Sequence, residues 1–201
     1  MNHKQGEQSM DTRLNADEEK KTKNLLDEKL FKQRIIMIYG AITQEVARQV
    51  TEKLLILSAE SKKEIKIYIN SQGGHVESGD TIFDMIRFID APVKIIGTGW
   101  VASAGALIFA APPVENRLCL PHTRFMIHQP LGGMMGSAVE LEIEAKEIIK
   151  MKERLNRTLA EQTGQPLEKV AKDTDRNYWM QAEEAREYGL VGKIIEKISD
   201  I

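Results

Sequence analysis

Short apolar segments alternate with amphipathic segments through the first two thirds of the chain. The strand-like runs are 35–40, 65–70 and 91–99, and the segments with helical periodicity are 43–60, 78–89 and 103–111. Residues 118–128 predict one or two further short strands. Because regular alternation favours βαβ crossovers, we expect an α/β fold built on a mostly parallel sheet.

Two segments fall where such sheets bind ligands, beyond the carboxyl ends of the strands. Gly73 and Gly74 close the segment Asn-Ser-Gln-Gly-Gly, and Ser103 follows the run 91–99. We therefore expect these segments to be neighbours in space. The glycine pair is typical of a tight turn, and it could also present backbone N–H groups to an anion or a peptide carbonyl.

Ser103 stands among small residues in Gly-Trp-Val-Ala-Ser-Ala-Gly. A serine at the start of a helix is most often a cap. It could instead be a nucleophile, because the neighbouring N–H of Ala104 has no partner inside the helix and could hold an oxyanion. The segment does not match the G-x-S-x-G elbow, since residue 101 is valine.

His128 ends an apolar strand-like run. A single histidine there is usually a hydrogen-bonded structural residue, but facing Ser103 it could accept the hydroxyl proton. A third group would then orient the imidazole. Spacing alone does not choose among Asp173, Asp175 and Asn177, which lie in a polar run that also reads as a solvated turn.

A long amphipathic helix is predicted after the glycine-rich turn at 131–136. Ser137 and Glu140 form a capping box, and Gly164 stands where the helix would end. Its apolar stripe contains Leu141, Ala145, Ile148, Met151, Leu155 and Leu159. About 27 residues would span about 40 Å, more than a domain of this size covers. A partner subunit could cover the stripe, or the helix could lie along its own domain.

The remaining composition restricts the class of protein. The 201 residues suffice for one domain with a core, and the net charge of −2 implies no general affinity for nucleic acid or anionic membranes. A single cysteine, Cys119, fits a reducing compartment. Without an apolar run of about 20 residues, the chain is expected to be cytoplasmic. We expect a mobile polar tail at 1–24 and one domain at 25–201.

Several long motifs, in order and at matching spacing, resemble the ClpP family, the proteolytic subunits of ATP-dependent Clp proteases. The likeness covers more than four fifths of the chain, from about residue 34 onward. The matching segments are IYINSQGG (67–74), GWVASAGA (99–106), RLCLPHTRFMIHQPLGG (117–133), EIEAKEIIKMKERLN (142–156) and 163–194.

The resemblance implies a ClpP/crotonase-like fold of repeated βαβ units in a spiral, with a protruding handle helix at about 132–160. It implies that Ser103 is the nucleophile, that His128 is the general base, and that Gly74 and Ala104 are the oxyanion donors. Two seven-membered rings would stack into a tetradecamer enclosing a chamber. The ring-to-ring contacts implied are Gln129, Gly132, Gly133, Asp175 and Arg176.

The resemblance also implies a partner, an AAA+ unfoldase such as ClpX or ClpC that threads unfolded proteins into the chamber. The unfoldase would use the ATP, so this chain would need no cofactor and no metal. The implied docking residues are Tyr68, Phe88, Leu120 and Ile195. Lys66 falls where the family commonly has an aromatic residue.

Three departures distinguish the chain from the family pattern. Asn177 occupies the position of the catalytic aspartate, 49 residues after His128. Gln72 replaces the proline of Ser-Pro-Gly-Gly, which we expect to loosen the loop that carries one oxyanion donor. The polar tail replaces an apolar N-terminal segment that lines the axial pore.

These features predict a serine endopeptidase that acts on unfolded proteins, weak alone and active in a mixed tetradecamer with a paralogous subunit. One alternative is a catalytically silent structural or regulatory ring subunit. Another is a hydratase or isomerase of the related crotonase-like fold, acting on acyl-CoA; CoA binding would distinguish it.

Overall fold

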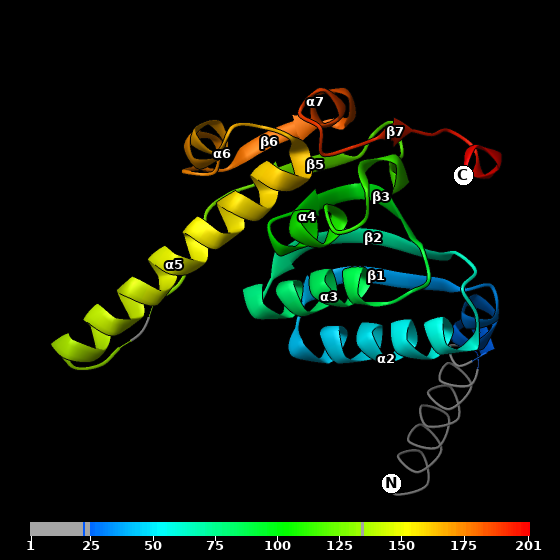
Figure 1. Cartoon of the computed structure of the whole chain (residues 1–201), viewed down its shortest axis with the longest axis horizontal. Helices are drawn as coiled ribbons and strands as arrows, with labels where there is room; N and C mark the ends of the chain where they lie inside the picture. The colour runs from blue at the N-terminus through cyan, green and yellow to red at the C-terminus, as the bar shows by residue number, and fades with distance from the viewer. Residues whose placement is uncertain (1–21, 23–24, 134) are drawn as a thin grey trace, which may run out of the picture. The chain divides into compact units, whose positions relative to one another are not determined.

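A seven-stranded sheet organises the computed structural model, which describes residues 22, 25–133 and 135–201 (Figure 1). Its strands run in the order β1-β2-β3-β4-β7, and β5 pairs with both β3 and β6. The strands are β1 (Ile35–Ile42), β2 (Ile65–Gly74), β3 (Val93–Ala102), β4 (Arg117–Cys119), β5 (Arg124–Ile127), β6 (Tyr178–Gln181) and β7 (Lys193–Ile194). β2, β4 and β5 lie parallel to β3, as expected, whereas β6 runs antiparallel to β5.

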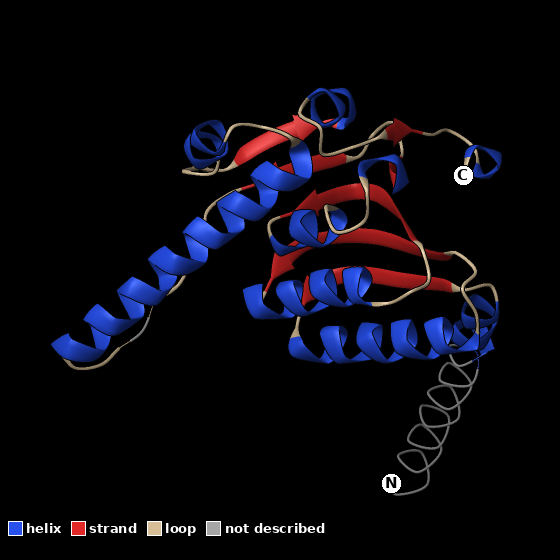
Figure 2. Ribbon diagram, viewed as in Figure 1, coloured by secondary structure: helices blue, strands red, loops and turns tan. Residues whose placement is uncertain are grey.

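Three helices, α2 (Gln44–Glu60), α3 (Val76–Phe88) and α4 (Ala104–Phe109), pack side by side over β1, β2 and β3 (Figure 2). Thr43 caps α2 by accepting a hydrogen bond from the Val46 N–H. Each helix turns an apolar face to the sheet, and the strands present side chains such as Ile67 and Ile95 that are fully buried. Apolar burial between these layers forms the core.

The longest helix, α5 (Ala138–Thr163), extends away from the sheet (Figure 1). The predicted capping box is present at Ser137 and Glu140, and Gly164 ends the helix in the left-handed conformation. The apolar stripe is exposed at Leu141, and it is buried only near the carboxyl end, at Leu159. The described chain therefore leaves the first half of this stripe uncovered.

Two short helices and two single turns complete the fold. They are the helices α6 (Leu167–Asp173) and α7 (Ala182–Glu187), with the single turns η1 (Val114–Asn116) and η2 (Ile198–Asp200) before and after. Arg117 is almost fully buried and holds the carboxyl end of α5, donating to the backbone C=O of Gln162 over 2.6 Å and to that of Pro112 over 2.7 Å. The helix is thus fixed at one end.

Several predicted boundaries were wrong by a few residues. β1 ends at Ile42 rather than at residue 40, β3 covers Val93–Ala102 rather than 91–99, and α4 covers Ala104–Phe109 rather than 103–111. β2 continues to Gly74 rather than ending at residue 70, because the Ser71 side chain is buried and hydrogen-bonded within the sheet. α3 begins at Val76 rather than at about residue 78. The prediction of a polar tail at 1–24 falls almost wholly outside the described residues.

Residues Ile36–Ile201 form one compact unit, and the described residues before Ile36 do not belong to it. The unit Ile36–Ile201 contains every element from α2 onward. Over the described part of the chain, no helix is both long enough and apolar enough to cross a membrane.

Candidate active site

The ends of three neighbouring strands converge on one edge of the sheet. Ser103 follows β3, His128 follows β5, and these strands are parallel neighbours, so the two residues emerge together. Asn177 precedes β6, whose antiparallel pairing sets Tyr178 opposite Ile127. The sheet topology therefore brings together three residues that are far apart in sequence.

Ser103 has a positive φ of 57°, which non-glycine residues rarely adopt, together with a ψ of −123°. Its side chain makes no capping hydrogen bond to α4. Instead its Oγ lies 2.8 Å from Nε2 of His128. Ser103 thus occupies the N-cap position of α4, but its side chain does not cap the helix, and the strained turn directs the hydroxyl toward the imidazole.

The second ring nitrogen of His128 faces Asn177, with Nδ1 3.0 Å from the side-chain Oδ1. An amide oxygen can only accept, so Nδ1 carries the proton and Nε2 is left free to accept from the serine hydroxyl. Asp173 and Asp175 make other contacts: Asp173 binds Lys169 and the Tyr188 hydroxyl, and Asp175 lies 3.4 Å from Nζ of Lys152. Of the three candidates, only Asn177 contacts the imidazole.

Backbone hydrogen bonds restrict which N–H groups near Ser103 remain available. The N–H of Ser103 donates to the C=O of Met126, and that of Gly73 donates to Oγ of Ser71. Ala104 is the first residue of α4, where N–H groups have no partner within the helix. The N–H groups of Gly73 and Ser103 are therefore already hydrogen-bonded. The predicted oxyanion donors are the residues that directly follow them, Gly74 and Ala104.

Gly73 approaches the serine so closely that no side chain fits there. A Cβ at this position would lie 2.6 Å from Cβ of Ser103 and 2.8 Å from the C=O of Ala102, and the φ of 93° also favours glycine. The end of β2 therefore packs directly against the turn that carries Ser103.

Side chains of β2 tie this segment to β1. Oγ of Ser71 donates to the C=O of Gly40 over 2.6 Å. The Gln72 amide, oriented to satisfy both neighbours, donates to the same C=O over 3.2 Å and accepts from the Ala41 N–H over 3.3 Å. These bonds oppose the loosening expected from the absence of proline at position 72.

A small apolar pocket opens beside Ser103. Its walls are Val76 on α3, Leu107 on α4, Ile127 and Pro130 near His128, and Leu155 and Leu159 on α5. Its volume is about 30 Å³, which is room for roughly two water molecules. The lining would accept an apolar side chain and reject a charged one.

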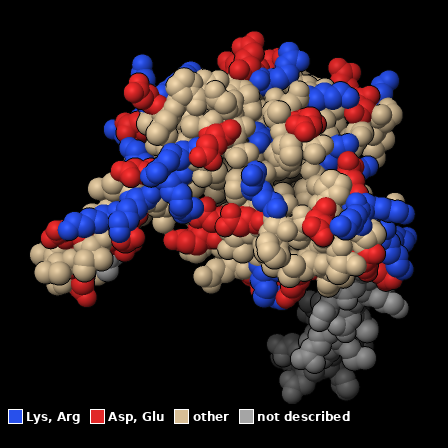
Figure 3. All heavy atoms as spheres, viewed as in Figure 1, with Lys and Arg blue, Asp and Glu red and all other residues tan. Residues whose placement is uncertain are grey.

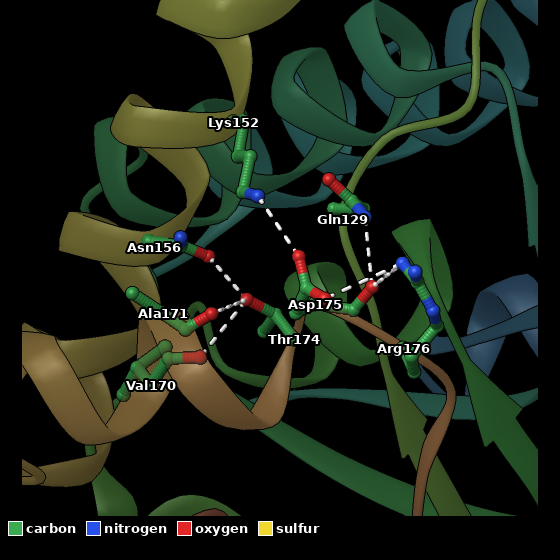
Figure 4. A network of polar contacts seen from close by, with 8 residues as sticks. All are labelled: Gln129, Lys152, Asn156, Val170, Ala171, Thr174, Asp175 and Arg176. Atoms are coloured by element: carbon green, nitrogen blue, oxygen red, sulfur yellow. Dashed lines mark hydrogen bonds and ion pairs between the residues drawn. The ribbon is translucent and has the colours of Figure 1, made fainter.

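Three of the residues predicted for ring-to-ring contact, Gln129, Asp175 and Arg176, lie close together in one polar network (Figure 4). Nε2 of Gln129 donates to the backbone C=O of Asp175 over 2.7 Å, and Arg176 is 85 % exposed and contacts Asp175. Gly132 and Gly133 are exposed in the loop before α5. Behind them, the buried Thr174 hydroxyl donates to Asn156 of α5 over 2.8 Å, which fixes the segment carrying Asn177.

The predicted docking residues differ in their exposure. Phe88 is 76 % exposed and Leu120 is 38 % exposed. Tyr68 is partly buried and packs against a cluster that contains Ile195, which is only 2 % exposed. Ile195 therefore supports this surface from beneath and presents little area to a partner.

Sequence reasoning misses two contributors to the site. One is Ser71, although a small polar residue directly before Gln72 and the glycine pair is a signal that could have pointed to it. The other is the pocket wall from α5, whose leucines the sequence shows only as part of the stripe. Among the described residues, no cluster of His, Cys, Asp and Glu side chains could hold a metal ion.

Comparison with known proteins gives consistent results. Residues 17–198 match the Clp protease family. The chain is 62 % identical over 172 residues to ATP-dependent Clp protease proteolytic subunit 3 of Rhizobium etli, covering 86 % of this chain and 89 % of the relative. It is 61 % identical over 178 residues to proteolytic subunit 2 of Gluconobacter oxydans, covering 88 % and 80 %.

Solved structures agree with the sequence comparisons. ClpP1 from Listeria monocytogenes superposes with a TM-score of 0.79 at 54 % identity, covering 87 % of this chain and 98 % of that one. An Asn-to-Asp mutant of the same protein gives a TM-score of 0.81 at 55 % identity, with the same coverage.

Proposed function

Since this chain belongs to the Clp protease family, and is a proteolytic subunit and serine peptidase of that family, we propose that Ser103, His128 and Asn177 form its catalytic triad. The observation that carries the proposal is the continuous contact from Asn177 through His128 to Ser103, over 3.0 and 2.8 Å. The roles of nucleophile, base and orienting group follow from which atoms can donate and accept.

In the proposed reaction, Oγ of Ser103 attacks the peptide carbonyl while Nε2 of His128 takes the hydroxyl proton. The backbone N–H groups of Gly74 and Ala104 stabilise the negative charge on the carbonyl oxygen. His128 then gives the proton to the leaving amine. A water molecule, deprotonated by the same imidazole, hydrolyses the acyl-enzyme and restores the serine.

Asn177 supports a weak rather than an absent activity. Its amide oxygen holds the imidazole in the productive tautomer, yet it carries no charge to stabilise the imidazolium. In a serine protease of another fold, replacing the triad aspartate by asparagine costs about 10⁴ in turnover, because the imidazole is held in the wrong tautomer. Here the acceptor already faces Nδ1, so we propose a smaller deficit.

We further propose that the chain works in a double heptameric ring, with a paralogous subunit raising its activity, and that an AAA+ unfoldase such as ClpX or ClpC supplies unfolded proteins. The uncovered apolar stripe of α5 and the exposed Phe88 and Leu120 support this assembly. The unfoldase would consume the ATP, and the chemistry above uses no cofactor of this chain. The buried thiol Cys119 is consistent with a cytoplasmic location.

The alternative of a catalytically silent ring subunit rests on Asn177, and the test is direct. Wild type and Ser103→Ala are each incubated with a fluorogenic peptide and with a fluorophosphonate probe, while mass measurements record the assembly state. We expect the probe to modify wild type at Ser103 alone and Ser103→Ala not at all. An assembled wild type that resists the probe, also when mixed with a paralogue, would establish the silent subunit instead.

A further inference from the structure

One ion pair joins the helices on either side of the pocket next to Ser103. The guanidinium of Arg154 on α5 binds the carboxylate of Asp80 on α3 through two hydrogen bonds of 2.7 Å each. The fork of an arginine matches a carboxylate in this bidentate geometry, which fixes direction as well as distance. This pair raises the pKa of Arg154, principally through the hydrogen bond to Asp80.

Each partner lies close in its helix to a residue that lines the pocket. Asp80 lies one helical turn after Val76 and shares its face of α3. Arg154 directly precedes Leu155, and Leu155 and Leu159 form the α5 wall. The ion pair therefore links α3 and α5, the two helices that form opposite walls of the pocket.

Charged side chains around the Asp80–Arg154 pair also attract α5 toward α3. Figure 3 shows Lys and Arg side chains gathered along the visible face of α5, beside a cluster of Asp and Glu on the adjoining body. Asp84 and Glu77, both on α3, add to the electrostatic attraction of Arg154 toward that helix. A second polar contact between α3 and α5, from Arg87 to Gln162, is long at 3.5 Å and lies at the far ends of both helices.

The small volume of the pocket means that the distance between its walls limits which side chains can enter. An engineered cavity of about 150 Å³ in another protein holds a benzene ring, whereas the pocket here has about 30 Å³. A large side chain can enter only if the walls separate. The sheet and α4 form a closely packed core, so α5 is the less constrained wall. Arg117 holds it at Gln162 and Thr174 holds it at Asn156, and Asp80 adds the contact that draws it toward α3.

We propose that the Asp80–Arg154 pair is a positioning device that sets the size of the substrate side chain accepted next to Ser103. With the pair intact, the α5 wall stays close to Val76 and small apolar side chains are favoured. With the pair broken, the wall recedes and large side chains gain. This inference rests on the proposed role of Ser103 as nucleophile.

The test compares two peptide substrates that differ only in the residue before the scissile bond, alanine or phenylalanine. The variants are Asp80→Asn, the charge exchange Asp80→Arg with Arg154→Asp, and the conservative Asp80→Glu. The control is Glu142→Gln, which breaks an exposed ion pair with Lys146 on the same helix, away from the pocket. Reaction of Ser103 with peptidyl phosphonates bearing the same two side chains gives a second readout that needs no turnover.

We expect Asp80→Asn to raise the phenylalanine-to-alanine ratio of kcat/KM by at least about fivefold, mainly through a lower KM for phenylalanine, since pocket fit discriminates by such factors. Asp80→Glu and the charge exchange should return the ratio toward that of wild type, and Glu142→Gln should leave it unchanged. Equal losses for both peptides would show a merely structural pair and overturn the proposal. If wild-type Ser103 reacts with neither phosphonate, the proposed function itself fails; if it reacts and the ratios are identical in all variants, only the role of the pair fails.

Discussion

The side-chain oxygen of Asn177 lies 3.0 Å from Nδ1 of His128 and accepts its hydrogen bond without carrying a formal charge. The arrangement separates two tasks that an aspartate performs together, orienting the imidazole and stabilising its positive charge. Replacing one residue can therefore restore or remove each task.

Asn177→Asp should raise kcat by at least about tenfold, because the carboxylate adds stabilisation of the imidazolium. Asn177→Leu, of similar size, should lower kcat by about tenfold or more, since the imidazole loses its acceptor. Steady-state peptide hydrolysis, with the assembly state matched among the three proteins, measures both effects. Equal turnover by the leucine variant and wild type would show that the Asn177 contact does not contribute.

Gly73→Ala should abolish hydrolysis while the protein remains folded. The added methyl group would meet Cβ of Ser103 and the backbone at Ala102, so the nucleophile turn must move. The φ of 93° adds strain. Gly40→Ala is the matched control, because its φ of 81° adds similar strain while a Cβ there meets no atom within 4 Å. Circular dichroism and peptide hydrolysis distinguish the effects; an active Gly73→Ala protein would contradict the close packing of this site.

Arg117→Met should destabilise the fold by about 3 kcal/mol, because buried carbonyl groups lose a charged donor. The carbonyls affected are those of Pro112 and Gln162. Arg186→Met, which removes only an exposed ion pair with Glu183, should change the unfolding free energy by less than about 1 kcal/mol. Urea denaturation measures both variants, and equal midpoints would refute the anchoring role of Arg117.

Cys119 should resist thiol reagents in the folded protein. Burial raises the pKa of its thiol to about 12, with a smaller contribution from the charge of Glu183. The thiolate needed for reaction is therefore scarce at pH 8. An absorbance assay with a disulfide reagent should detect no reaction until urea unfolds the chain. Rapid reaction of the native protein would show that the sheet opens at this point.

The same pKa shift gives a direction for alkaline stability. From the reference pKa of 9.0 up to about 12, the unfolded chain loses the thiol proton while the folded chain keeps it, so unfolding becomes more favourable as pH rises. Below that range the thiol is protonated in both states and contributes no pH dependence. Thermal unfolding of wild type and Cys119→Ala from pH 8 to pH 11 should show a steeper decline for wild type.

The sequence patterns predicted the strand and helix order because apolar periodicity reflects burial, which also determines the elements. They could not decide between a capping and a reactive Ser103, because that depends on a backbone angle and on a partner 25 residues away. Nor could spacing separate Asn177 from Asp175. Only the antiparallel pairing of β5 with β6, a long-range contact, places residue 177 opposite residue 128.

The pocket escaped sequence analysis for a related reason. Leu155 and Leu159 belong to a helical stripe, and nothing in the stripe says which of its members meets α3. The Asp80–Arg154 contact joins residues 74 positions apart in the chain. Such pairs become visible only when the helices are placed in space.

The helix α5 is fixed to the body by Arg117 near one end and is largely exposed at the other. A rod of this kind is a lever whose pivot lies close to the nucleophile and whose long arm projects about 30 Å beyond it at 1.5 Å per residue. A small rotation at the pivot corresponds to a large sweep at the tip, and a modest displacement of the tip is reduced to a fine adjustment near Ser103. A contact that displaces the exposed end of α5 would therefore also shift, by a smaller distance, the helix wall next to Ser103.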